Sequence, residues 1–199
     1  MGKTVDYYMM PGSPWTYLGH DRFVALCRQH DATVRVKPID LGKVFAVSGG
    51  LPLPKRAPQR QAYRLVELAR WSAFLNLPLN VQPKFGASGP ELASRFILAA
   101  SESDVANALA LAGAVMRARW AEERDIADPS TLAAIAQGLG LDVEALAARA
   151  ATPEIAARFD ACTQEAIEAQ VFGAPWYVVD GEPFWGQDRL DFLARKLAK

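Results

Sequence analysis

A serine stands where this sequence predicts the start of a helix and where a reacting group would also be well placed. Ser13 is followed by Pro14, and Trp15, Leu18 and Leu26 continue at helical spacing. Serine is a preferred N-cap and proline fits the first helical position, so a helix is predicted from residue 14. The free N–H groups and the macrodipole of such a start favour an anion. Two interpretations stay open: Ser13 only caps the helix, or its hydroxyl also acts on a bound ligand.

The cysteines and histidines of the chain do not complete a catalytic group with Ser13. Cys27 is about 14 residues further along the predicted helix, or roughly 21 Å away, and His20 is about 10 Å away. Cys27 and Cys162 lie far apart and form no CxxC motif, which indicates two unpaired, buried thiols in a reducing compartment. The sequence therefore predicts neither disulfide exchange at Ser13 nor a zinc site.

Composition narrows the class of protein. The chain has 199 residues, 51% of them hydrophobic, which is enough to build a sizeable core. It has 22 basic and 22 acidic side chains, so it lacks the surplus of positive charge that a nucleic-acid binder needs. No signal peptide and no apolar run of about 18 residues is found, so we expect a soluble, cytoplasmic protein without a membrane contact.

The elements that must position Ser13 begin with a βαβ unit. Residues 5–10 form a short apolar run that ends at Pro11-Gly12, and residues 33–39 alternate with period two. Strand, helix and strand in this order predict two parallel strands.

An alanine-rich stretch without a strand pattern follows, and it is predicted to be helical. The predicted helices cover 58–75, 91–100, 102–123, 129–138, 142–150 and 153–170. Ser101 and Asp104 have the spacing of a capping box, and Thr152-Pro153 that of a cap and first turn. Residues 176–179 and 183–185 around Asp180-Gly181 predict a hairpin, and Asp188 is predicted to cap a final helix.

A βαβ half and a ββα half separated by helices make an α/β, thioredoxin-like fold with a large all-helical insertion, as in DsbA-like proteins. Four motifs in order resemble the 2-hydroxychromene-2-carboxylate isomerases, which are related to kappa-class glutathione transferases. The motifs are residues 12–18 (GSPWTYL), 51–56 (LPLPKR), 172–175 (FGAP) and 184–190 (FWGQDRL). The resemblance implies a thioredoxin-like domain of residues 1–42 and 171–199 and an insertion domain of residues 43–170.

The resemblance also implies that glutathione is the cofactor. Ser13 stands where a dithiol oxidoreductase of this fold has its first cysteine, so the reactive thiol must come from a bound molecule. The hydroxyl of Ser13 would then donate a hydrogen bond to the glutathione sulfur and, with the helix start, favour the thiolate.

Two further segments are implied to hold glutathione. Thioredoxin-like folds place a cis proline opposite the helix start, so the N–H and C=O of Ala174 before Pro175 would pair with the glutathione backbone. Base rates alone favour a trans bond, because only about 5–6% of X–Pro bonds are cis. Trp185, Gly186, Gln187 and Asp188 match the segment that grips the γ-glutamyl end.

A basic loop is the candidate for the substrate. Lys55, Arg56, Arg60 and Arg64 form a basic cluster after a proline-rich loop that includes Pro54. The cluster is either a solvated face, or Lys55 and Arg56 bind the carboxylate of a small aromatic substrate. A family lysine that contacts substrate aligns with Phe45, and a family tyrosine lies near Phe85. The resemblance therefore implies a more apolar substrate pocket in this chain.

The first functional hypothesis is a glutathione-dependent isomerase that interconverts 2-hydroxychromene-2-carboxylate and trans-o-hydroxybenzylidenepyruvate, or a related aromatic carboxylate. A kappa-like glutathione transferase or peroxidase is the second, and a non-catalytic thioredoxin-fold protein that binds glutathione or peptides is the third. By analogy with related proteins, a homodimer is expected.

Overall fold

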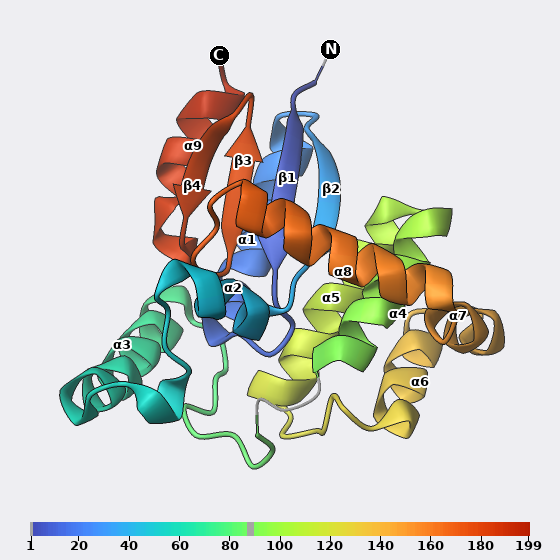
Figure 1. The fold of residues 1–199 in the computed structure, drawn as a ribbon, viewed down its shortest axis with the longest axis horizontal. Helices are drawn as coiled ribbons and strands as arrows, with labels where there is room; N and C mark the ends of the chain where they lie inside the picture. Colours follow the sequence, from blue (N-terminus) through green and yellow to red (C-terminus); the bar gives the residue numbers. More distant parts are fainter. Residues whose placement is uncertain (1, 87–89) are drawn as a thin grey trace.

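The centre of the computed structural model, which describes residues 2–86 and 90–199, is a mixed sheet with strand order β2-β1-β3-β4 (Figure 1). Strand β1 runs parallel to β2 and antiparallel to β3, and β3 pairs antiparallel with β4. The strands are β1 (Thr4–Met9), β2 (Thr33–Pro38), β3 (Trp176–Val179) and β4 (Glu182–Trp185). This confirms the predicted βαβ unit and the predicted hairpin. Asp180 and Gly181 in the hairpin turn both have positive φ, 51° and 77°, as a tight two-residue turn requires.

Helices surround the sheet, and each helix that the sequence predicts is present. They are α1 (Pro14–Gln29), α2 (Leu41–Ser48), α3 (Pro58–Leu75), α4 (Pro90–Ser103), α5 (Val105–Trp120), α6 (Pro129–Gly138), α7 (Val143–Ala150), α8 (Pro153–Glu168) and α9 (Leu190–Leu197), with short 3₁₀ helices η1 (Leu53–Lys55) and η2 (Gln187–Arg189). The predicted α/β class, thioredoxin-like with a helical insertion, is therefore confirmed. Among the described residues, no helix combines the length and apolar character needed to cross a membrane.

Two helix boundaries differ from the prediction. Helix α4 continues through Ser103, and Asp104 alone caps α5 by accepting a hydrogen bond from the Ala106 N–H at 2.8 Å. Ser101 is not a cap, because its hydroxyl donates to the Leu98 carbonyl one turn earlier. Helix α2 was not predicted as a separate element, although Asp40 accepts from the N–H groups of its first turn.

The alternation of side chains along β1 divides the core between the two faces of the sheet. Tyr7 packs on one face against Phe23 of α1, with ring centroids 4.4 Å apart, and stacks on Tyr177 of β3 at 5.4 Å. Tyr8 belongs to a second buried cluster that includes Val44 of α2 and Ala166 of α8. Because successive strand residues point to opposite faces, α1 and α8 cover opposite sides of β1, and α8 crosses the sheet in Figure 1.

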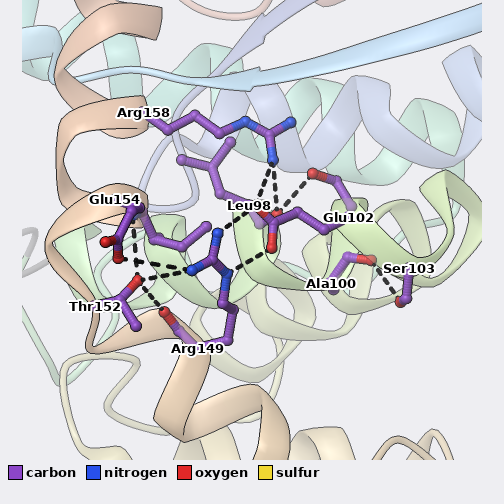
Figure 2. Close-up of polar contacts among 10 residues, drawn as sticks. Leu98, Ala100, Glu102, Ser103, Arg149, Thr152, Glu154 and Arg158 are labelled. Atoms are coloured by element: carbon purple, nitrogen blue, oxygen red, sulfur yellow. Dashed lines mark hydrogen bonds and ion pairs between the residues drawn. The ribbon is translucent and has the colours of Figure 1, made fainter.

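Helices of the predicted insertion contact both the sheet and one another. Helices α4, α5 and α8 all pack against β2. Glu102 on α4 accepts two hydrogen bonds from the Arg149 guanidinium, at 2.7 and 3.0 Å, and lies 3.6 Å from Arg158 of α8 (Figure 2). Arg149 lowers the pKa of the Glu102 carboxyl, chiefly through these hydrogen bonds. The division into residues 1–42 with 171–199 and residues 43–170 stays a prediction.

His20 links three elements inside the core. It is 2% exposed, with Nδ1 3.1 Å from the Tyr7 hydroxyl and Nε2 2.9 Å from the Leu109 carbonyl oxygen. A carbonyl only accepts, so Nε2 carries the proton and Nδ1 accepts from Tyr7. Burial lowers the pKa of His20. Its neutral imidazole thus joins β1, α1 and α5 and is occupied away from Ser13.

This arrangement predicts a loss of stability in acid. His20 titrates at about 6.5 in the unfolded chain and lower in the folded protein. Its contribution to the free energy of unfolding is therefore complete above about pH 6.5 and falls as the pH drops toward the lowered pKa. His20→Gln should remove this pH dependence and cost about 1–3 kcal/mol at neutral pH, because buried partners lose their hydrogen bonds.

Urea unfolding between pH 7.5 and 5 measures the effect. The control His30→Gln removes the other imidazole and retains His20, so the acid loss should persist in that variant. If His20→Gln kept the same loss as the unchanged protein, another group would be responsible.

Candidate functional site

The site begins where the chain leaves β1 and enters α1. Ser13 is 4% exposed, and its Oγ accepts a hydrogen bond from the Thr16 N–H at 3.2 Å. Its own N–H donates to the Met10 carbonyl at 2.9 Å, which closes the turn between strand and helix. The predicted cap is thus confirmed. The cap also holds the hydroxyl at the mouth of the helix start, beside the free N–H groups of the first turn.

A segment far along the chain meets this helix start. The peptide bond between Ala174 and Pro175 is cis, as the resemblance implies. The Ser13 hydroxyl donates to the Ala174 carbonyl oxygen at 3.4 Å, across 161 residues of sequence. A carbonyl oxygen has two lone pairs, so its pairing with a ligand stays a prediction. Within the described residues, the Ala174 N–H makes no hydrogen bond, so it is the main-chain group that a ligand can use.

Aromatic side chains border the cis peptide. The Phe172 ring lies 4.7 Å from that of Trp185 and 4.8 Å from that of Trp176, both edge to face. Gly173 allows this approach, because a Cβ there would lie 2.5 Å from Nε1 of Trp185. Trp185 is nevertheless 51% exposed and Phe172 43% exposed. These rings form an open apolar surface beside Ala174.

The segment after Trp185 is fixed by buried contacts. Gly186 has φ of 101°, which favours glycine, and its N–H donates to the Pro175 carbonyl at 3.0 Å. Gln187 is 2% exposed, and Nη1 of Arg22 donates to its side-chain oxygen at 2.9 Å and to its backbone oxygen at 3.2 Å. The amide oxygen of Gln187 is therefore committed to α1 and positions the loop.

One expectation for this segment needs correction, and one residue was missed. Asp188 does not cap α9; it lies in η2, is exposed, and pairs with Arg189 at 2.5 Å. The 3₁₀ turn moves the helix start past Asp188. Arg22 was not recognised as a positioning residue. The sequence does contain a signal for this role. Arg22 lies four residues after Leu18 and four before Leu26, so it shares the face of α1 that carries apolar side chains.

The protein's own thiols are far from reactive. Cys27 and Cys162 are buried and unpaired, as predicted. Burial raises the pKa of Cys27 to about 12 and that of Cys162 to about 11. Neither forms a thiolate near neutral pH, and the thiolate is the nucleophile in sulfur chemistry.

The predicted substrate residues form a second group. Arg56 donates from Nε to the Leu51 carbonyl at 2.7 Å, and its guanidinium lies 5.8 Å from the centroid of the Phe45 ring. Burial, and then the charge of Arg60, lowers the pKa of Arg56. Phe45 and Arg56 are therefore brought together. No hydrogen bond, ion pair or ring contact among the described residues joins this pair to Ser13.

The remaining substrate candidates lie around that pair. Lys55 is exposed in η1, and the carbonyl of Pro54 is 3.5 Å from the amide nitrogen of Gln61. The Phe85 ring lies 5.3 Å from the Lys84 ammonium and is partly buried. Lys43, two residues before Phe45, pairs with Asp160 at 2.7 Å. The role of all these residues in substrate binding stays a prediction.

Comparison with known proteins places the whole chain in one family. The DSBA-like thioredoxin domain matches residues 4–198. A protein of Pseudomonas putida named 2-hydroxychromene-2-carboxylate isomerase is 30% identical, over 98% of this chain and 94% of its own. The protein of that name from Sphingobium xenophagum is 28% identical, over 97% of each chain.

A solved structure and a more distant relative agree with this assignment. A structure of 2-hydroxychromene-2-carboxylate isomerase superposes with a TM-score of 0.83 at 29% identity, covering 98% of this chain and 94% of that one. Glutathione S-transferase kappa 1 of Caenorhabditis elegans is 24% identical, over 96% of this chain and 88% of its own.

The link between Arg22 and Gln187 gives a test of how the site is held. Arg22→Met should lower the free energy of unfolding by about 1–3 kcal/mol, because the buried oxygens of Gln187 lose their donor. Arg28→Met is the matched control, since Arg28 is exposed on the same helix and makes no ion pair within the described residues. Equal losses in the two variants, measured by urea unfolding, would contradict the role of Arg22.

Proposed function

The chain belongs to the DSBA-like thioredoxin domain family, and we propose that it is a glutathione-dependent isomerase of 2-hydroxychromene-2-carboxylate, or of a related small aromatic carboxylate. One observation supports this above all: a serine, hydrogen-bonded to the carbonyl before a cis proline, occupies the helix start where dithiol enzymes of this fold carry sulfur. Full-length similarity to two proteins named as this isomerase supports the choice of reaction.

The groups at the helix start fit the cysteinyl part of glutathione. The Ala174 N–H has no hydrogen-bond partner within the described residues, and the Ser13 hydroxyl lies 3.4 Å from the carbonyl oxygen of the same residue. The exposed ring of Trp185 adds an apolar surface beside them. Main-chain pairing of this kind is how extended peptides bind to strand edges. Trp185, Gly186, Gln187 and Asp188 would border the γ-glutamyl end, with the Asp188 carboxylate available to an ammonium group.

Glutathione, when bound, supplies the nucleophilic thiol that Cys27 and Cys162 do not. The Ser13 hydroxyl would turn from the Ala174 carbonyl to donate to the ligand sulfur, and the first turn of α1 would stabilise negative charge there. Lys55 and Arg56 would attract the substrate carboxylate, with Phe45 and Phe85 on the apolar side of the pocket.

A kappa-like glutathione transferase or peroxidase is the second candidate, and the kappa-class relative favours it. The same Ser13 site would serve either reaction. A non-catalytic protein that binds glutathione or peptides would share the site without turnover. We also propose a cytoplasmic homodimer: the site would depend on reduced glutathione, which a reducing compartment supplies, and the dimer follows the resemblance.

Three assays separate these candidates. The isomerase should change the absorbance of 2-hydroxychromene-2-carboxylate only in the presence of glutathione. Conjugation of chlorodinitrobenzene without isomerisation would favour the transferase. Thermal stabilisation by glutathione with neither activity would indicate a binding protein.

Ser13→Ala should lower isomerase turnover by about ten- to a hundredfold, because hydrogen bonds to charged groups contribute about 1.5–3 kcal/mol. Glutathione affinity should stay within a few-fold, since main-chain groups provide most of the binding. The control Thr152→Ala removes the cap of α8, so it separates a general loss of stability from a loss of chemistry. Unchanged turnover in Ser13→Ala would exclude Ser13 from the reaction.

Glutathione at a hundred times its Kd should stabilise the folded protein by about 2.7 kcal/mol, through mass action. The analogue with alanine in place of cysteine should stabilise it to a similar extent, because the Ala174 N–H pairs with the peptide backbone. A thermal melt with each ligand measures both effects. No shift with millimolar glutathione would contradict the proposed function.

A further inference from the structure

Two arginines from different helices lie over one indole ring. The Arg119 guanidinium, near the end of α5, is 5.0 Å from the centroid of the Trp120 ring. The Arg64 guanidinium, on α3, is 6.0 Å from the centroid of the same ring. Arg119 is 4% exposed and Trp120 2% exposed, and Arg64 is partly buried. Two positively charged groups therefore lie beside the same buried ring.

These charges make no direct contact with a carboxylate within the described residues, although Asp125 lies near enough to Arg119 to raise its pKa slightly against the larger effect of burial. Within the described residues, neither Arg64 nor Arg119 makes an ion pair, and the same holds for Arg56 and Arg60 nearby. The residues that the structure does not describe, 1 and 87–89, contain no acidic side chain. Many other cations are paired, as Arg149 is with Glu102 at 2.7 Å. Burial distinguishes this region, because Arg119 is a buried guanidinium that makes no ion pair within the described residues.

The surroundings leave polar atoms unused. Arg119 donates from Nη1 to the Gly86 carbonyl, but its buried Nε has no partner among the described residues. Burial lowers the pKa of Arg119, and burial together with the charges of Arg56 and Arg119 lowers that of Arg64. Burying a charge without a partner is costly. An anion bound between the two guanidiniums would relieve both effects.

A chain of contacts connects the pair to the start of α1. The Trp120 carbonyl accepts from the Asn80 N–H at 2.7 Å, and the Tyr17 hydroxyl donates to the Pro78 carbonyl at 2.8 Å. Tyr17 is about one helical turn, or 6 Å, beyond Ser13 on α1. Residues 78–80 thus connect the first turns of α1 with the end of α5, and Figure 1 shows α3 and that end of α5 in the same lower part of the molecule.

We propose that Arg64 and Arg119, with the Trp120 ring as an apolar wall, bind the carboxylate of the aromatic substrate and orient its ring toward Ser13. The identity of the ligand rests on the proposed function; the need for a carboxylate rests on the two guanidiniums. A guanidinium offers paired donors that match a carboxylate. Arg56 is less suited, because its Nε already donates to Leu51, and with Lys55 it would guide the substrate from the surface.

The test uses 2-hydroxycinnamate, an aromatic carboxylate that resembles the substrate, and its neutral amide as the probe without charge. Arg64→Gln should weaken 2-hydroxycinnamate binding, measured by calorimetry without glutathione, by about tenfold or more, and leave the weaker binding of the amide unchanged. Arg64→Lys should recover part of the affinity. Arg119→Met should act in the same direction, and Arg64→Gln keeps the test decisive if that buried variant does not fold.

Arg70→Gln is the matched control, because Arg70 is exposed on the same helix and already pairs with Glu67. Equal affinities for 2-hydroxycinnamate in Arg64→Gln and the unchanged protein would overturn the proposal, as would an equal loss in Arg70→Gln. Thermal shifts with glutathione separate the two sources of a carboxylate. If Arg64→Gln lost only the glutathione shift, the arginines would serve glutathione and the proposal would fail.

Turnover of the chromene separates this inference from the proposed function. An increase in KM of about tenfold or more in Arg64→Gln, with kcat little changed, would support both. If the protein had no isomerase activity but Arg64→Gln still lost 2-hydroxycinnamate binding, the proposed function would fail and the carboxylate site would stand.

Discussion

The site depends on one meeting of distant segments, the start of α1 against the peptide before Pro175. Antiparallel pairing of β1 with β3 produces it. Tyr8, near the end of β1, pairs with Trp176 at the beginning of β3, so the chain that leaves one strand and the chain that enters the other lie at the same edge of the sheet. That register brings Ser13 and Ala174 near each other, and the hydrogen bond between them joins the two segments. A shift of register would separate the hydroxyl from the main-chain groups that the proposed chemistry needs.

Local signals were sufficient for most of the fold. Ser13 with Pro14, Thr152 with Pro153, and Asp180 with Gly181 are signals whose hydrogen bonds or dihedral angles are settled within a few residues, and the structure has each of them as predicted. Ser101 and Asp188 show where such signals fail. Each has the side chain of a cap, but a competing local partner, the Leu98 carbonyl for one and Arg189 for the other, occupies it. The identity of the cap was therefore decided by geometry that a sequence does not display.

The sequence predicted which segments carry the site residues, but it did not predict the long-range contacts that these residues make. The sequence placed Ser13, Ala174 and Trp185 in three motifs, and the fold gathers those motifs. It could not show that Arg22 holds Gln187, because that contact joins residues 165 apart and depends on how η2 packs on α1. The sequence showed Arg64 only as a member of a basic cluster and did not indicate Arg119, for a related reason. A balanced total of 22 basic and 22 acidic side chains hides a region in which the basic side chains make no ion pair within the described residues.

Because the unpaired basic side chains are gathered in one region, the protein would recognise the two proposed ligands by different groups. A serine at the helix start leaves the protein without its own thiolate there, so the proposed reaction needs two small molecules bound side by side. Glutathione has carboxylates as well, and a single basic pocket would bind either molecule. Near Ser13 the chain offers hydroxyl and main-chain groups with an exposed indole, which suit a peptide. The guanidiniums stand apart over Trp120, where planar paired donors suit a planar aromatic acid. Separating main-chain recognition from charge recognition would keep each ligand in its own half of the site and bring the thiol and the ring together between them.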